Sequence, residues 1–171
     1  MFEALFPMEK EIVDKLERKA RELYQGPGST NTRWTESFKD VLFDMGEGQG
    51  YKAYCSRREP ERRHGWLWDV CWLIVGTKWT ELRGVMLACE IEWNPDEYYL
   101  LEDFLKLTVC EANYRLFIFT MKKPDDFTQF DLLMNACPGS RGYRYLAIGV
   151  PRTKDWRDQK LEKLPYRAWT L

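Results

Sequence analysis

The chain has 171 residues, of which 44% are hydrophobic and 15% aromatic, and its formal net charge is −1. This composition excludes a disordered chain, and the near-zero charge excludes a general electrostatic attraction to nucleic acid. The length favours one domain over two, and no apolar run approaches the ~20 residues that span a bilayer. We therefore expect one domain over residues 1–171, with no membrane segment.

Residues 1–50 predict two helices, because apolar residues recur at helical spacing over 9–24 and again over 34–45. A Gly-Pro-Gly sequence separates them, and Asn31 or Thr32 can cap the second.

Residues 51–150 predict the core of the domain. Continuously apolar runs at 66–75 and 84–93 indicate interior strands of a hairpin that is covered on both faces. Asp96 can cap the helix that follows. The complete set of expected elements is strands at 51–55, 66–75, 84–93, 114–120 and 143–150, and helices at 97–111 and 125–136.

The order of these elements predicts an α/β fold with the core order α-β-β-β-α-β, in which helices flank both faces of a mixed central sheet. The helix at 97–111 is a long crossover, so the strand after it should run parallel to the strand before it. Its expected apolar stripe is Leu101, Leu105, Thr108 and Val109. The C-terminal extension, 151–171, is either a short edge strand or an ordered tail, and the sequence leaves both open.

The five cysteines indicate the expected compartment. They form no C-x-x-C pair, their number is odd, and three lie in apolar runs. The first ten residues also lack the basic and apolar segments of a secretory signal. We therefore expect reduced thiols in a cytoplasmic protein.

Three carboxylates interrupt the two apolar strands: Asp69 in the first, and Glu90 and Glu92 in the second. A carboxylate among apolar residues is costly unless it is paired, protonated or bound to a metal. Because side chains alternate along a strand, Asp69 and Glu90 share a face in one hairpin register and lie on opposite faces in the register shifted by one residue. The sequence leaves both registers open. On a shared face, these two side chains and the carbonyl between Glu90 and Glu92 would offer hard oxygen ligands to Mg²⁺ or Mn²⁺.

Charge is unevenly distributed around these acids. Residues 90–103 hold six acids and no base, whereas residues 141–167 hold eight bases and three acids. One loop between predicted strands carries four more bases, Arg57, Arg58, Arg62 and Arg63. A metal site beside a phosphate-bearing substrate would have this arrangement, and so would an ordinary solvated surface of mixed charge.

The same residues carry a family resemblance. Asp69, the strand segment Glu90-Ile91-Glu92-Trp93 and the helix segment Asp103-Phe104-Leu105-Lys106-Leu107 resemble the core of the PD-(D/E)XK nuclease superfamily, which has the restriction-endonuclease-like fold. The resemblance covers roughly residues 51–120. The usual pattern has a lysine two residues after the second acid, where this chain has Glu92. The chain is similar to those members whose lysine lies on the following helix, here Lys106.

The resemblance implies hydrolysis of phosphodiester bonds in DNA or RNA. It implies that Asp69, Glu90 and Glu92 hold Mg²⁺ or Mn²⁺, with Glu92 binding a second ion or orienting a water. Lys106 would stabilise charge that develops on the phosphate, although it could also form a simple surface ion pair with Asp103.

The implied partner is nucleic acid, bound in part by the four loop arginines. Because no separate recognition domain is apparent, we expect either little sequence specificity or a homodimer or partner protein that supplies it. The alternative is a protein of this fold that has lost catalysis and acts as a nucleic-acid-binding or protein-interaction module, an alternative that the displaced lysine and the net charge of −1 motivate.

Overall fold

The protein folds around one mixed β-sheet. The computed structural model describes residues 3–25, 30–56, 67–78, 81–123, 128–136, 142–151 and 163–170. In these residues six strands form a sheet in sequence order: β1 (Lys52–Cys55), β2 (Val70–Val75), β3 (Leu82–Glu92), β4 (Ala112–Met121), β5 (Arg144–Pro151) and β6 (Tyr166–Thr170). The described helices are α1 (Pro7–Gln25), α2 (Asn31–Gly48), α3 (Glu97–Thr108) and α4 (Thr128–Ala136).

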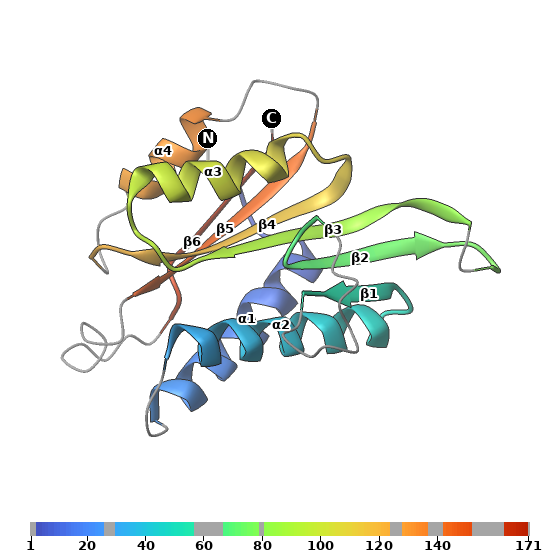
Figure 1. Ribbon diagram of the computed structural model, residues 1–171, viewed down its shortest axis with the longest axis horizontal. Coiled ribbons are helices and arrows are strands. Elements are labelled where there is room, and N and C mark those ends of the chain that lie inside the picture. The colour runs from blue at the N-terminus through green and yellow to red at the C-terminus, as the bar shows by residue number, and fades with distance from the viewer. Residues whose placement is uncertain are drawn as a thin grey trace.

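Helices cover both faces of the sheet (Figure 1). One apolar cluster joins α1 and α2 to one face, and a second cluster joins α3 and α4 to the other. Strand β4 pairs in parallel with β3 and with β5, whereas the remaining neighbours are antiparallel. The predicted α/β fold with a mixed central sheet is therefore confirmed. Each predicted strand and helix has a counterpart, and α3 is the expected crossover between parallel strands.

Close packing fixes α2 against β2. The indole of Trp72 lies fully buried on this face and donates to the Leu42 carbonyl at 2.9 Å. Gly46 lets the helix approach this closely, because a Cβ there would lie 2.5 Å from the Trp72 ring. Helix α2 is thereby held directly over the start of β2, where the candidate site begins.

Two local expectations were wrong. Thr30, rather than Asn31 or Thr32, caps α2, and its hydroxyl accepts from the backbone N–H of Arg33. Helix α3 buries a different stripe from the expected one, because its buried residues are Leu100, Phe104 and Leu107. Leu105 and Val109, which were expected in the core, are 44% and 83% exposed.

The C-terminal segment, the cysteines and the absence of a membrane segment were the remaining expectations about the fold. The C-terminal segment forms an edge strand, β6, which pairs antiparallel with β5. Cys55, Cys71, Cys89 and Cys110 are buried free thiols, and Cys137 lies outside the described residues. No helix in the described ranges is both long and apolar enough to cross a membrane.

Candidate functional site

The register of the central hairpin decides the relation between Asp69 and Glu90. Val70 pairs with Cys89 and Cys71 with Ala88, which is the register that puts Asp69 opposite Glu90. Strand β2 begins at Val70, whereas β3 continues to Glu92, so β3 extends past the start of its neighbour. Within the described residues, the sheet is therefore open on the β2 side of β3 at the point where the predicted acids lie.

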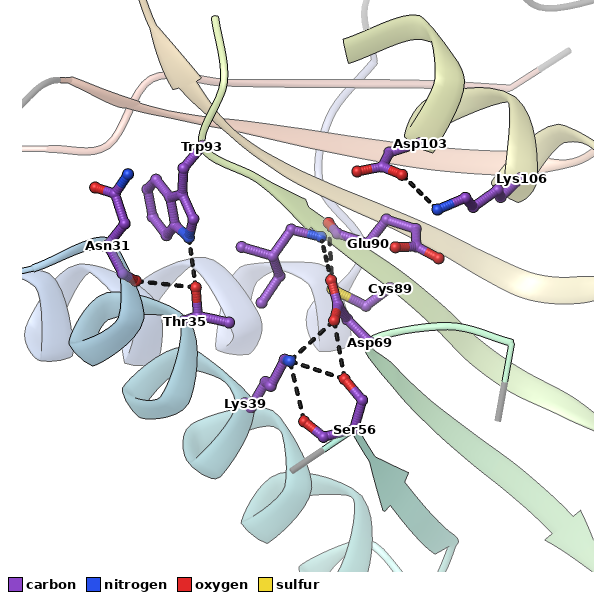
Figure 2. Close-up of polar contacts among 11 residues, drawn as sticks. Asn31, Thr35, Lys39, Ser56, Asp69, Cys89, Glu90, Trp93, Asp103 and Lys106 are labelled. Atoms are coloured by element: carbon purple, nitrogen blue, oxygen red, sulfur yellow. Dashed lines mark hydrogen bonds and ion pairs between the residues drawn. The ribbon is translucent and has the colours of Figure 1, made fainter. Parts of the chain in front are cut away.

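Asp69 occupies this opening and is held by three donors (Figure 2). One carboxylate oxygen accepts from the Lys39 ammonium at 2.9 Å and from the Ser56 hydroxyl at 3.0 Å. The other accepts from the backbone N–H of Ile91 at 3.0 Å. The Asp69 carboxylate thus accepts the backbone hydrogen bond of β3 that a residue of a longer β2 would otherwise accept. Its negative charge is balanced by the Lys39 ammonium.

Lys39 was not anticipated from the sequence. It is buried on α2, where it donates to the Ser56 carbonyl at 3.0 Å and to the Ser56 hydroxyl at 2.8 Å as well as to Asp69. All three ammonium protons therefore have acceptors. The one feature of the sequence that could have indicated its burial is its position three residues before Leu42, at the edge of the apolar stripe of α2.

Glu90, unlike Asp69, forms no ion pair that would balance its charge within the described residues. Its side chain is 4% exposed, and its Oε1 atom has no hydrogen-bond partner among the described residues. Burial is the main cause that raises the pKa of Glu90 to about 8, and the charge of Asp69 raises it further. The cations of Lys106 and Lys39 act in the opposite direction. At neutral pH Glu90 therefore holds a proton or requires a cation.

A second polar cluster lies on the α3 side of Glu90. Asp103 accepts from the Lys106 ammonium at 2.5 Å, and Glu92 accepts from the backbone N–H of Asn94 at 2.5 Å. Burial raises the pKa of Glu92, and a hydrogen bond with Asp103 adds to this increase. From the sequence, Asp103 had no expected role at the site beyond a possible ion pair with Lys106, and the structure places it between Lys106 and Glu92.

Lys106 forms the anticipated ion pair and also faces the acids. Its side chain is 49% exposed, and Figure 2 shows its ammonium on the side of α3 near Glu90. The hydrogen bond to Asp103 is the main cause that raises the pKa of Lys106, and the charges of Glu90 and Asp69 also raise it. This cation is therefore electrostatically coupled to the candidate site while it remains accessible from solvent.

Arg115 fixes the end of α3 that carries Lys106. Its buried guanidinium donates to three carbonyls: that of Leu107 in the last turn of α3, that of Cys110 just after the helix and that of Ala112 at the start of β4. It also stacks on the Tyr143 ring, 3.7 Å from the ring centroid. One residue of β4 thus ties the last turn of α3 and the turn that follows it to the sheet, which helps to set the position of α3.

The predicted site residues are brought into one region but not into one ligand set. Asp69 lies with Lys39 and Ser56, and Glu92 lies with Asp103, so Glu90 stands between two polar clusters. No three His, Cys, Asp or Glu residues of the described segments are arranged to hold a metal ion. The loop bases Arg57, Arg58, Arg62 and Arg63 lie outside the described residues.

The donor types nevertheless fit a hard divalent cation. Glu90 offers a carboxylate oxygen that has no partner in the described segments, and a carboxylate oxygen is the kind of ligand that Mg²⁺ and Mn²⁺ prefer. Asp69 is a less suitable ligand, because one of its oxygens already accepts from Lys39 and from Ser56. Its other oxygen accepts one hydrogen bond, from the backbone N–H of Ile91, and so could still bind a cation. The fit therefore centres on Glu90.

One base of the C-terminal basic segment has a structural role instead of facing a substrate. Arg144 is buried and pairs with Glu9 at 2.7 Å and with Glu3, and it also donates to the Ala4 carbonyl. These contacts attach the N-terminal segment and α1 to strand β5. Among the eight bases of residues 141–167, Arg144 is therefore part of the scaffold and does not face a substrate phosphate.

Comparison of the chain with models of protein families, with curated proteins and with solved structures finds no match. Three features of the described part of the chain mark the candidate site: Glu90, a buried acid with no partner there at one oxygen; an opening in the sheet beside it; and Lys106, a half-exposed lysine on the facing helix.

Proposed function

We propose that this protein is a nuclease that hydrolyses phosphodiester bonds of DNA or RNA with Mg²⁺ or Mn²⁺. The observation that carries the proposal is the state of Glu90, which is 4% exposed and has one carboxylate oxygen without a partner in the described residues. Buried polar groups are almost always hydrogen-bonded, so an exception calls for an explanation such as a catalytic role or a bound ion. Carboxyl groups with strongly shifted pKa values also cluster at functional sites. The resemblance of the surrounding residues to PD-(D/E)XK nucleases supplies the reaction class.

Each residue of the region has a proposed role. Glu90 and Asp69 would hold the cation, and Glu92 would ligate a second ion or orient the attacking water. The ion, when bound, lowers the pKa of a water molecule and neutralises charge on the scissile phosphate. Lys39 and Ser56 keep the Asp69 carboxylate in one orientation, which supports a preorganised site.

Lys106 would meet the phosphate. A carboxylate-lined site repels a substrate that bears negative charge, and a cation aimed at the reacting oxygens offsets this repulsion in the transition state. Lys106 is accessible and already coupled to Glu90. Arg57, Arg58, Arg62 and Arg63 would add contacts to neighbouring phosphates along the strand.

A second candidate function has its own supporting observation. Lys39 and Ser56 satisfy Asp69 without any metal, as expected if catalysis has been lost and the acid has become part of the scaffold. The protein would then be a nucleic-acid-binding or protein-interaction module built on a nuclease-like arrangement.

A cleavage assay separates the two candidates. Labelled single-stranded and duplex DNA and RNA are incubated with the parent chain, with Glu90→Gln and with Glu111→Gln, each with Mg²⁺, with Mn²⁺ or with EDTA. Glu111 is an exposed glutamate and serves as the matched control. We expect metal-dependent cleavage by the parent and the control, and a rate at least about 10²-fold lower for Glu90→Gln. A parent chain that binds these substrates but cleaves none with either metal contradicts the nuclease proposal and supports the binding module.

A further inference from the structure

Two aromatic rings stand in solvent at the start of α3. Tyr98 is 71% exposed and Tyr99 is 45% exposed. Their ring centroids are 5.3 Å apart and the rings are nearly perpendicular, with an interplanar angle of 88°. One ring therefore packs edge-on against the other, and this contact helps to hold Tyr99 in place without burying it.

The helix puts Tyr99 in line with the polar groups of the candidate site. Residues three, four and seven apart lie on one face of a helix, so Tyr99, Asp103 and Lys106 form a single stripe. Tyr99 lies roughly 10 Å from Lys106 along the helix axis, at 1.5 Å per residue. Because β3 ends at Glu92 and α3 begins at Glu97, Tyr99 lies at the carboxyl end of β3, just beyond the acids.

Tyr98 belongs to a different face. It shares a stripe with Leu105 and Val109, which are exposed and point away from the sheet. Helix α3 thus presents two surfaces: an outer apolar one, and one on which an aromatic ring, an acid and a lysine follow one another toward Glu90. Only the second contains a charge suited to phosphate.

We propose that Tyr99 is a stacking subsite for an unpaired nucleobase of the substrate, next to the phosphate that Lys106 contacts. This inference rests on the proposed nuclease function and narrows its substrate class to single-stranded nucleic acid. An exposed aromatic ring stacks on the face of any base, and such stacking is sequence-tolerant. A base inside a duplex is already stacked on its neighbours and paired, so a ring beside the phosphate site gains this contact only with an unpaired strand.

Binding measured without metal tests the subsite separately from cleavage. The fluorescence anisotropy of a labelled oligonucleotide, single-stranded or annealed to its complement, is titrated in EDTA with the parent, Tyr99→Leu, Tyr99→Trp and Leu105→Ala. Leu105 has nearly the same exposure as Tyr99, 44% against 45%, but lies on the other face of α3, so it is the matched control. Because both substituted side chains, Tyr99 and Leu105, are partly exposed, the melting temperatures of the three variants should stay close to that of the parent.

We expect Tyr99→Leu to weaken single-strand binding about 10-fold, within the range for loss of one base stack, and to leave duplex binding unchanged. Tyr99→Trp should restore the affinity, and Leu105→Ala should have no effect. Equal single-strand affinities for the parent and Tyr99→Leu would overturn the subsite while leaving the nuclease proposal in place. If the parent chain neither binds nor cleaves any nucleic acid, this result contradicts the proposed nuclease function itself. A Tyr99→Leu variant that alters only self-association, seen by sedimentation, also overturns the subsite and assigns the tyrosines to an interface between protein molecules.

Discussion

Lys39 and Asp69 form an ion pair of 2.9 Å that joins α2 to the start of β2, and both side chains are largely buried. The acid that resembles the first member of a nuclease motif therefore already has a counter-charge from its own chain. Glu90 stands opposite Asp69 in the hairpin register, and its Oε1 atom has no hydrogen-bond partner among the described residues. The electrostatic need for a proton or a metal ion is consequently concentrated on Glu90.

Removing Lys39 should destabilise the fold. Lys39→Met leaves Asp69 and the Ser56 carbonyl without their cationic donor, and we expect the free energy of unfolding to fall by about 2 to 3 kcal/mol. Urea denaturation of the metal-free protein measures this change. The double variant Lys39→Met with Asp69→Asn should recover part of the loss because it no longer buries an unpaired charge. An unchanged urea midpoint for Lys39→Met would show that the ion pair contributes nothing.

Glu90 should make stability depend on pH. Its pKa is about 8 in the folded protein against an ordinary value of 4.5, so the folded state keeps a proton that the unfolded state releases in this window. The folded protein should therefore lose stability as the pH rises from about 4.5 to about 8, by up to about 1.4 kcal/mol per pH unit from this group. Glu90→Gln should flatten the profile measured by urea unfolding in EDTA, and Glu111→Gln should not. Parallel profiles for the parent and Glu90→Gln would contradict the assignment.

Lys106 should matter for turnover more than for folding. Lys106→Met keeps most of the aliphatic stem and removes the charge, so we expect the melting temperature to change little and the cleavage rate to fall about 10²-fold. Lys52 is a suitable control because its side chain is 47% exposed, against 49% for Lys106, and it also pairs with an acid. Cleavage by Lys106→Met at the rate of Lys52→Met would remove Lys106 from the mechanism.

The loop arginines should contribute to nucleic-acid binding through their charge alone. Neutralising Arg57 and Arg58 together should weaken binding to all sequences alike and lower the slope of log affinity against log salt by about 2. Binding titrations at several salt concentrations measure this slope. A second variant, in which Arg62 and Arg63 are neutralised together, repeats the measurement for the other pair. Binding that does not respond to salt in the parent would exclude these residues as phosphate contacts.

The sequence predicted the fold well because apolar periodicity and continuous apolar runs follow directly from burial. It misjudged the face of α3 because two apolar stripes fit the helix. Leu101, Leu105 and Val109 recur at helical spacing, and so do Leu100, Phe104 and Leu107. The second set contains the bulky ring of Phe104, which packs against Phe117 at 5.5 Å between centroids, and this set is the one that is buried.

The site was harder to predict because the residues that pair with one another there are distant in the sequence. The acids stood out because they interrupt apolar strands, and the register that aligns Asp69 with Glu90 was one of two permitted by side-chain alternation. Lys39 gave no comparable signal, since a lysine beside an apolar stripe is ordinary on a helix surface. Its role depends on Asp69, which lies on the opposing sheet and becomes its neighbour only when α2 packs there.

Calorimetric titration with Mn²⁺ at pH 7 tests the central claim most directly. Because Glu90 has a pKa of about 8, metal binding at its carboxylate should displace close to one proton, and the observed heat should then depend on the ionisation enthalpy of the buffer. We predict binding with this buffer dependence for the parent and Glu111→Gln, and at least about 10-fold weaker binding without proton release for Glu90→Gln. Equal Mn²⁺ affinity in the parent and Glu90→Gln, or no binding by the parent, would contradict the assignment of Glu90 as a metal ligand.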